Sequence, residues 1–587
     1  MTKQAKTKKK PSLITWRLYV VVSLIILVFI GIAARAAFLQ VIDSEKLRHQ
    51  GDLRSKRTIV SQSHRGNIFD RHGTALAVSV PVEVVWAEPN VIHKNNGLED
   101  RRRWEALAGV LERPVEKLLK AVENPKKRFV YLKRQVSPAQ ADYIKQLKIP
   151  GIYLKPSSRR YYPTGEVTSH VVGFTNIDDE GKNGIEKTYD DWLTGAPIKR
   201  KVRRARDGMV VERLNTVEEG ENANDVVTSI DQRIQAIAYK ELKTATEKYR
   251  ATSGSVIVLD VQTGEVLAMA NTPSYNPNNR RTMKPYRMRN RAIADMYEPG
   301  STIKPLAAMM ALDYGKYDLD SEIDTSPGFY RLGANTVRDS RNYGKIDINT
   351  VIAKSSNVGV SRMALSVPKE HLLNSYFNLG FGSATHITLP AESSGVLSER
   401  SRWSDFEIAT LSFGYGLAVT PLQLARAYSV IANEGKLNPI SILKLEQPPR
   451  AEQVIEPRVA NAMLQMMEGV TKDGGTAVKA RIGGYRVAGK TGTARKATAG
   501  GYGEDYIVSF AGIAPIDNPR LVTVVIINEP KGDKYYGGDV AAPVFAKVTT
   551  GALQLLNVAP SKTVELPVKI AATNQGQSPL VGGVHEQ

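Results

Sequence analysis

The distribution of hydrophobic and polar positions begins with a long apolar run near the N-terminus. Residues 18–39 carry a single charge, Arg35, and predict one membrane-spanning helix. At about 1.5 Å per residue this helix would be about 33 Å long, enough to cross a hydrocarbon core of roughly 30 Å. Ala34-Arg35-Ala36 loosely resembles a cleavage site. The run is nevertheless longer than the apolar part of a typical signal peptide, so we expect an uncleaved anchor.

Residues 40–222 show a mixed pattern of short apolar and charged stretches. Within them, residues 80–86 predict a strand, whereas residues 102–119 and 138–147 predict helices. We recognise no catalytic constellation in this part of the chain, and we expect an irregular, non-catalytic domain.

From about residue 223 the pattern becomes regular, and residues 231–249 place apolar side chains on one face of a predicted helix. The other predicted elements are a strand at 224–230, a hairpin at 255–270, mainly helices from 301 to 432, and strands at 485–494, 507–513 and 521–528. Strands at both ends with helices between them predict an α/β (α+β) fold, in which helices cover an antiparallel sheet.

These patterns divide the chain into five predicted segments. They are a basic tail (1–17), a transmembrane helix (18–39), a non-catalytic domain (40–222), a catalytic domain (223–560) and a tail (561–587). The last segment is expected to be disordered, because it is rich in Gly, Gln, Ser and Asn.

Charge and composition add an orientation and exclude several kinds of chemistry. The chain has 80 Lys and Arg, 59 Asp and Glu, and no Cys, which excludes disulfides, thiol catalysis and Cys-based metal sites. Basic residues without an acid precede the apolar run and predict a cytoplasmic N-terminus, with everything after about residue 40 exported. Further basic clusters lie at 101–103, 126–128 and 199–204, without a nucleic-acid-binding motif. We interpret them as solvated or membrane-facing surface and expect no nucleic-acid partner.

The first candidate catalytic pair is Ser301 and Lys304. A Pro-Gly turn precedes Ser301 and an apolar helical run follows it, so Ser301 should start a helix with Lys304 one turn away. A serine nucleophile needs a base, and a lysine can serve where burial and neighbouring cations lower its pKa. The same S-x-x-K spacing recurs at Ser366 and Ser441. There, a proline or a strand-like context favours coincidence.

The second candidate motif is Ser355-Ser356-Asn357, 54 residues after Ser301. It supplies a hydroxyl that can pass a proton and an amide that can bind a peptide carbonyl. Ser340-Arg341-Asn342 has the same spacing but lies in a charged, turn-like stretch. We favour Ser355 because predicted helices flank it on both sides.

The third candidate motif is Lys490-Thr491-Gly492-Thr493, which occurs once and lies in a predicted strand. Gly492 would allow another backbone to approach closely, so an extended peptide could pair with this strand. The two threonine hydroxyls and the charge of Lys490 suit a terminal carboxylate.

In this order, the three motifs resemble those of penicillin-binding proteins and serine β-lactamases. Other segments extend the resemblance, over nearly the whole chain, to the class B penicillin-binding proteins and among them to the division-specific members. These segments are Arg65–Arg71 with Gly73 and Leu76-Ala77, Arg159–Pro163, Gly184-Ile185-Glu186 through Gly195, Phe413–Gly416, Thr420–Ala425 and Tyr535–Gly538. The resemblance identifies residues 40–222 as a pedestal, or dimerisation-type, domain and residues 223–560 as a transpeptidase domain.

The resemblance implies a peptidoglycan D,D-transpeptidase that forms septal cross-links during cell division. Ser301 would attack the penultimate D-alanine carbonyl of a stem pentapeptide, and Lys304 would accept its proton. Ser355 and Lys490 would relay a proton to the departing D-alanine. An amine on a second stem, expected to be that of meso-diaminopimelate, would resolve the acyl-enzyme.

The resemblance also implies roles for the remaining motif residues. Asn357 would position the substrate amide, while Thr491 and Thr493, with Gly492 between them, would hold the terminal carboxylate. The backbone N–H groups of Ser301 and Thr493 would form the oxyanion hole. β-Lactams would acylate the same serine, and neither a metal nor an organic cofactor is expected.

The resemblance further implies a single-pass protein of the inner membrane with a periplasmic catalytic domain. A membrane-embedded glycan polymerase and other division proteins are the expected partners. The alternatives are an elongation-specific transpeptidase, which shares the motifs, and a non-enzymatic scaffold, which the intact motifs disfavour. A carboxypeptidase would use water instead of the amine. The pedestal and the anchor argue against a β-lactamase or a β-lactam sensor, and residues 40–222 show no glycosyltransferase constellation.

Overall fold

The computed structural model describes residues 15–61, 65–196, 198–204, 210–218, 222–398, 400, 402–498, 501–532 and 534–561. Its contacts divide the chain into two compact units: Met1–His64 with Thr194–Ala223, and Arg65–Leu193 with Asn224–Gln587. Most of the predicted N-terminal tail and all of the C-terminal tail after residue 561 lie outside the described residues.

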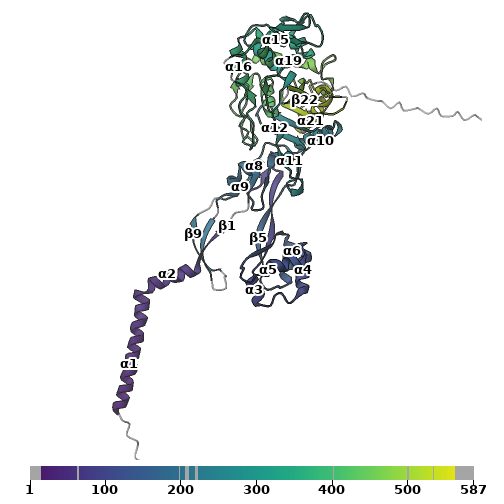
Figure 1. Ribbon diagram of the computed structural model, residues 1–587. Coiled ribbons are helices and arrows are strands. Elements are labelled where there is room, and N and C mark those ends of the chain that lie inside the picture. Colours follow the sequence, from purple (N-terminus) through teal and green to yellow (C-terminus); the bar gives the residue numbers. More distant parts are fainter. Residues whose placement is uncertain are drawn as a thin grey trace, which may run out of the picture. The chain divides into compact units, whose positions relative to one another are not determined.

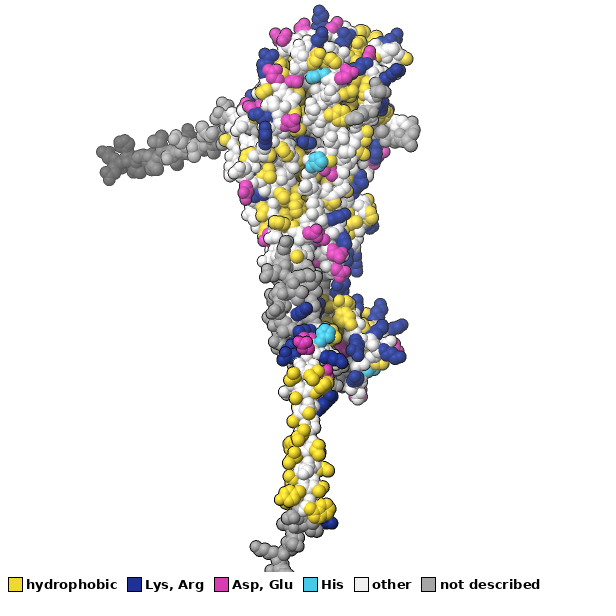
Figure 2. All heavy atoms as spheres, turned by 90° about the vertical axis from the view of Figure 1, so that its left-hand side faces the viewer, with side chains coloured by type: hydrophobic (Ala, Val, Ile, Leu, Met, Phe, Trp, Pro, Cys, Tyr) yellow, Lys and Arg dark blue, Asp and Glu magenta, His cyan; other side chains and the backbone are white. Residues whose placement is uncertain are grey.

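The first unit contains the apolar helix. Helix α1 (Thr15–Ala37) continues into a π-helical turn, η1 (Phe38–Ile42). Within the span from Trp16 to Ile42, an 18-residue window has a mean hydropathy of 2.6. Its side chains are exposed to the surroundings, and Figure 2 shows hydrophobic side chains covering it. Among the described residues it is the one helix long and apolar enough to cross a membrane.

A short helix and a small sheet complete the first unit. They are α2 (Ser44–Ser55) and the antiparallel strands β1 (Lys56–Ser61), β8 (Ile198–Arg204) and β9 (Val210–Glu218), in the order β1-β8-β9. Asp52 of α2 forms ion pairs with Lys56 and Arg203. The basic cluster at 199–204 is therefore part of a strand, which its charge pattern did not predict.

The second unit begins with the segment Arg65–Arg71, whose charged residues are largely buried. The Arg65 guanidinium donates to the Glu186 carboxylate at 2.7 Å and to Asp190 at 2.6 Å. Arg160 donates to the other oxygen of Glu186 at 2.6 Å. Buried charges are tolerated when they are paired and hydrogen-bonded, so this network explains why three distant segments carry charges at these positions.

Asp70 ties the same segment to the catalytic part of the chain. Its carboxylate accepts hydrogen bonds from the backbone of His72, Thr74 and Gln232. Strand β2 (Ile68–Phe69) pairs in parallel with β10 (Val226–Val227), the only part of the predicted strand 224–230 that has regular strand structure. A Cβ on Gly66 would lie 2.0 Å from the Asn224 oxygen, so only glycine fits there.

Residues 75–161 form a lobe that we call the head. Its strands are β3 (Ala75–Ala87), β4 (Val130–Val136) and β5 (Ile152–Tyr161), with β3 in the middle. Its helices are α3 (Pro89–Lys94), α4 (Arg101–Leu111), α5 (Val115–Val122) and α6 (Pro138–Gln146), which gather around one end of β5 in Figure 1. The single helix predicted for 102–119 is two helices, because Glu112 adopts a left-handed conformation and Pro114 follows.

Between the head and the catalytic part the chain forms short elements. They are α7 (Ser169–Val172), β6 (Phe174–Thr175), β7 (Gly181–Asn183), α8 (Gly184–Thr188) and α9 (Asp190–Thr194).

The catalytic part is built on a five-stranded antiparallel sheet in the order β12-β11-β23-β22-β21. The strands are β11 (Ser253–Asp260), β12 (Val266–Thr272), β21 (Ala488–Thr498), β22 (Gly501–Ala514) and β23 (Leu521–Asn528). Every residue of β11 and β12 is buried, so both faces of the sheet are covered. Helices α10 (Gln232–Lys248), α18 (Pro421–Ala432) and α21 (Ala542–Leu555) pack on it. The predicted helix-covered antiparallel sheet is confirmed.

The helical region lies between β12 and β21 in the chain. Its longer elements are α13 (Lys304–Asp313), α14 (Ile348–Lys354), α15 (Asn357–Leu365), α16 (Lys369–Asn378), α17 (Asp405–Ser412) and α19 (Pro457–Met466). It also contains β14 (Phe329–Leu332) and β15 (Asn335–Arg338), a hairpin that the sequence did not reveal.

Candidate active site

Ser301 lies in a tight turn at the start of a buried helix. The turn is the 3₁₀-helix η3 (Gly300–Ile303), and α13 follows from Lys304. Side chains three residues apart eclipse one another in a 3₁₀-helix, so Lys304 lies on the same side as Ser301. The Tyr428 hydroxyl of α18 donates to the Thr302 carbonyl at 2.6 Å and fixes the turn from behind.

Two glycines allow the chain to approach the turn that carries Ser301. Gly300 has φ +54°, a left-handed conformation that favours glycine, and its N–H donates to the Gly414 carbonyl at 3.1 Å. Gly414 has φ +91°, and a Cβ there would lie 2.1 Å from the Gly300 oxygen. The segment Phe413–Gly416 thus supports the turn that carries Ser301 through backbone contact.

Lys304 connects the first candidate motif to the second. Its side chain is 1% exposed, and Nζ donates to the Ser355 hydroxyl at 3.0 Å and to the Ser355 carbonyl at 2.5 Å. Burial, reinforced by the nearby charge of Lys490, holds the pKa of Lys304 well below its usual value, although Asp339 acts in the opposite direction. The lowered pKa increases the share of the neutral amine, the form that can accept a proton.

Ser355 owes its position to the end of α14. It caps that helix with φ +61°, a left-handed conformation that reverses the chain before α15 begins. The prediction that two helices flank Ser355 is confirmed by these elements, and the turn between them presents the hydroxyl to Lys304.

Asp339 is a candidate site residue that sequence reasoning missed. Its carboxylate accepts hydrogen bonds from the Ser356 hydroxyl at 2.5 Å, the Val358 N–H at 3.0 Å and the Asn357 N–H. The Asn357 amide also donates to the Arg338 carbonyl at 2.9 Å. Asp339 thus fixes the backbone at Asn357 and Val358 and so positions the Asn357 side chain. Its only signal in the sequence was its place directly before the rejected Ser340 motif.

Lys490 lies on β21 with no exposed surface, and its Nζ has no hydrogen-bond partner among the described residues. Burial lowers the pKa of Lys490 to about 7. Near neutral pH the amine can therefore both hold and release a proton.

Strand β21 is the edge of the five-stranded sheet, as β-addition of a peptide requires. The hydroxyls of Thr491 and Thr476 are 3.1 Å apart, and the Gly537 N–H donates to the Thr493 hydroxyl at 3.2 Å. A Cβ on Gly492 would lie 3.0 Å from the Pro299 oxygen, so glycine lets the strand pack directly against the segment before Ser301.

The three motifs meet at one cleft of about 710 Å³. Six of the eight predicted site residues line it. Lys490 and Gly492 belong to the same strand as Thr491 and Thr493, but they are buried and do not line the cleft. The lining site residues are Ser301, Lys304, Ser355, Asn357, Thr491 and Thr493.

The rejected motifs are elsewhere or play other roles. Ser366 ends α15 and donates to the Met363 carbonyl, and Ser441 donates to the Leu443 carbonyl. Neither lines the cleft. Ser340 does line it, with its hydroxyl 2.9 Å from that of Tyr343.

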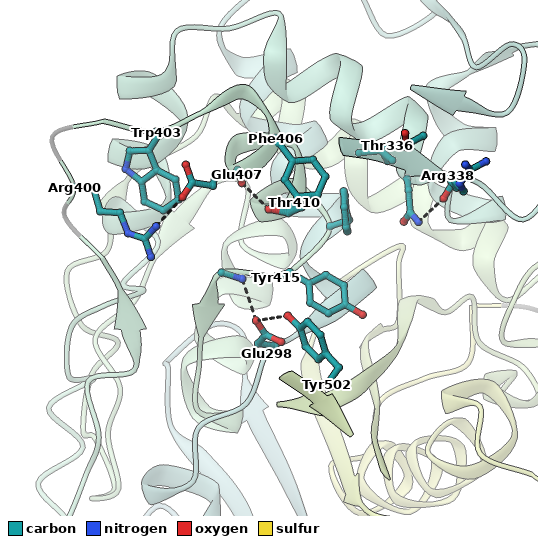
Figure 3. A pocket seen from close by; sticks show the side chains of 14 residues that line it. Glu298, Thr336, Arg338, Arg400, Trp403, Phe406, Glu407, Thr410, Tyr415 and Tyr502 are labelled. Atoms are coloured by element: carbon teal, nitrogen blue, oxygen red, sulfur yellow. Dashed lines mark hydrogen bonds and ion pairs between the residues drawn. The ribbon is translucent and has the colours of Figure 1, made fainter. Parts of the chain in front are cut away.

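A second cavity of about 540 Å³ shares the lining residue Asn357 with the cleft. Its walls combine charged and polar side chains with aromatic ones, among them Phe406, Tyr415 and Tyr502 (Figure 3). One oxygen of Glu298 accepts from the Gly416 N–H at 3.1 Å and from the Tyr502 hydroxyl at 3.3 Å. The other is buried without a partner among the described residues.

This arrangement fits a serine acyl-transfer site, because it combines a cleft-lining serine, a buried lysine whose pKa is lowered, and an edge strand. Among the described residues, no group of three His, Asp or Glu side chains could hold a metal ion.

Comparisons with known proteins agree with this class. Residues 254–550 match the penicillin-binding protein transpeptidase domain, and residues 60–228 match the penicillin-binding protein dimerisation domain. The peptidoglycan D,D-transpeptidase FtsI of Escherichia coli is 45% identical over 577 residues, which cover 98% of each chain. The chain belongs to the class B penicillin-binding proteins.

Two solved structures are similar to this chain. The transpeptidase domain of Burkholderia pseudomallei penicillin-binding protein 3 is 39% identical, with a TM-score of 0.53, and covers 57% of this chain and 98% of its own. A peptidoglycan synthetase from Bifidobacterium adolescentis is 28% identical, with a TM-score of 0.69, and covers 86% and 98%.

Proposed function

We propose that the protein is a peptidoglycan D,D-transpeptidase that forms peptide cross-links in the septal wall during cell division. The observation that carries this proposal is the buried Lys304 amine, which is bonded to Ser355 and lies on the same side of the turn as Ser301. Relatives named peptidoglycan D,D-transpeptidase FtsI match nearly the full chain and support the division assignment.

In the acylation step, the Ser301 hydroxyl oxygen attacks the penultimate D-alanine carbonyl of a donor stem. The neutral Lys304 amine takes the hydroxyl proton as the C–O bond forms. The backbone N–H groups of Ser301 and Thr493 stabilise the negative oxygen. When the peptide C–N bond breaks, Ser355 and Lys490 deliver a proton to the amine of the departing D-alanine.

The edge strand and Asn357 orient the donor before this step. The extended stem adds to β21, its terminal carboxylate binds Thr491 and Thr493, and the Asn357 side chain binds an amide of the stem. In the second step, an amine of a neighbouring stem, for which we propose meso-diaminopimelate, attacks the acyl-enzyme carbonyl and releases Ser301. β-Lactams acylate Ser301 but leave it blocked.

The anchor supports a proposal on topology and partners. We propose that helix α1 anchors the protein in the inner membrane, with the N-terminus in the cytoplasm and the catalytic domain in the periplasm; the apolar length of α1 and the lysines before it support this. We expect a membrane-embedded glycan polymerase and other division proteins as partners. An alkaline phosphatase fused after residue 60 should be active, and an inactive fusion would reverse the orientation.

Labelling with a fluorescent penicillin, followed by mass spectrometry of the adduct, tests the acyl-enzyme. Ser301→Ala should abolish labelling of folded protein. Ser366→Ala and Ser441→Ala are matched controls, because each removes the serine of another S-x-x-K sequence, and both should label normally. Labelling that persists in Ser301→Ala would refute the proposed mechanism. Rapid loss of the adduct from the wild-type protein would indicate a β-lactamase.

Depletion of the protein in its host distinguishes division from elongation. Filamentous cells are expected from failed septation, whereas round cells would assign the enzyme to elongation. A Ser301→Ala protein that restored normal division would show that the chain acts as a scaffold.

A further inference from the structure

Four aromatic side chains form a continuous row across the sheet of the head. Trp86 on β3 is the direct cross-strand neighbour of Tyr131 on β4 and of Tyr153 on β5. Its ring centroid lies 4.7 Å from that of Tyr153 and 4.9 Å from that of Phe129. Phe129 contacts Tyr131 edge to face at 4.6 Å. We call these four residues the aromatic row.

The aromatic row is not part of the core of the head. Phe129, Tyr131 and Tyr153 are 47%, 50% and 40% exposed. The residues next to Trp86 in its strand, Val85 and Ala87, are fully buried in the core formed with the head helices. Since successive side chains of a strand point to opposite faces, the helices cover one face and the rings stand on the other. An exposed cluster of large apolar rings is typical of a docking surface.

The row lies where the sheet is farthest from the segment Arg65–Arg71. Strand β3 pairs with β2 near its start, at Ala75 and Ala77, whereas Trp86 is its penultimate residue. The aromatic row is therefore at the distal end of the head sheet.

Basic side chains surround this distal end. Residues 123–134 contain five basic residues and one acid, Glu123. The cluster at 126–128 precedes Phe129 directly and is exposed, and no ion pair joins it to an acid within the described residues. Lys155 follows Tyr153 on the same face of β5 and is exposed as well. Arg134 lies 5.0 Å above the Tyr131 ring and pairs with Asp178.

We propose that the distal end of the head docks onto the surface of an anionic phospholipid bilayer. Trp and Tyr rings favour the headgroup level of a membrane, where an apolar body meets a polar rim. Lys and Arg beside them are attracted to anionic headgroups. Because α1 tethers the chain to a bilayer, the head meets that surface at high effective concentration, so a weak patch suffices.

The absence of cysteine from the sequence makes a site-specific test direct. Tyr131→Cys places a single thiol in the aromatic row, and Tyr143→Cys places one on α6, where Tyr143 is 45% exposed on the helical side of the head. The full chain carrying either change is labelled with a fluorophore and reconstituted into vesicles. Half of the lipid is phosphatidylglycerol, half is phosphatidylcholine, and part of either carries brominated acyl chains as a quencher.

Quenching at position 131 should be several-fold greater than at position 143. It should fall with added salt, in vesicles of phosphatidylcholine alone, and when Lys126→Glu and Lys127→Glu are combined with Tyr131→Cys. Fluorescent penicillin labelling of Ser301 should remain normal in every variant, which shows that the protein is folded.

Equal quenching at the two positions overturns the proposal. The proposal is also overturned if the fluorescence of the label at position 131 does not depend on anionic lipid but changes when soluble peptidoglycan strands are added. The surface would then bind glycan instead.

Discussion

Replacing Lys490 with methionine should raise the free energy of unfolding of the catalytic domain at neutral pH, although Lys490 belongs to the proposed catalytic machinery. Its pKa falls from 10.5 to about 7 on burial. In the unfolded chain Lys490 is protonated below about pH 10.5, whereas in the folded chain it becomes protonated only when the pH falls below about 7. The native lysine therefore costs stability as the pH falls through this window, and the cost reaches about 4 kcal/mol at pH 7.

Methionine has a similar length, does not titrate and leaves no hydrogen bond broken, because the Lys490 Nζ has no partner among the described residues. The stabilisation by Lys490→Met should be about 4 kcal/mol at pH 7 and about 1 kcal/mol at pH 10. Transpeptidation should be lost, since the amine that relays the proton is gone.

The assay is the Tm of the full chain in detergent, measured from pH 6.5 to pH 10 for wild type and variant. Lys479→Met is the matched control, because Lys479 also lines the cleft but is exposed and paired with Asp539, so its removal should not raise the Tm. A Lys490→Met protein with a lower Tm at pH 7 would refute the reasoning. A Tm difference that does not change with pH would refute it equally.

Three further predictions concern two residues that support the candidate active site and one buried residue of the pedestal. Asp339→Asn should slow acylation by penicillin, because a neutral amide accepts the three hydrogen bonds less well. It should also move the acidic limb of the acylation pH profile to lower pH, because Asp339 raises the pKa of Lys304, the base that must be neutral to act. Gly414→Ala should reduce the acylation rate about 100-fold through its 2.1 Å clash. By contrast, Gly416→Ala, with φ +84° and open space, should cost only about 1–2 kcal/mol of stability. Glu186→Gln should destabilise the pedestal by about 3–5 kcal/mol, because buried Arg160 loses its carboxylate partner and buried Arg65 keeps only Asp190. Hydrogen exchange of the pedestal would show this, and unchanged exchange would contradict it.

Periodicity predicted the elements whose burial is regular. The helix at 231–249 and the strands at 255–261 and 521–528 appear close to their predicted bounds, because one or both faces of each meet the same core. The strand β8 was missed, since its sequence is mostly basic and hides the alternation. The apolar pattern of residues 102–119 predicted a single helix, but the left-handed conformation of Glu112 divides this stretch into two helices. Periodicity does not report such a local turn.

The sequence by itself determined the chemical groups of the candidate site. Residue type and spacing singled out Ser301, Lys304, Ser355, Asn357 and the strand around Lys490, because each motif is a local arrangement on one turn or one strand. The candidate membrane span was predicted in the same way, by a long apolar run that contains a single charge, Arg35.

Only the tertiary structure decided that these groups meet and how they titrate. Ser301, Ser355 and Lys490 are separated by 54 and 135 residues, and packing brings the three motifs to one cleft. Asp339 became visible only there, because its role depends on backbone N–H groups from a distant helix. The pKa values of Lys304 and Lys490 are lowered mainly by burial. Burial depends on every element that packs around a side chain, so no local stretch of sequence contains it.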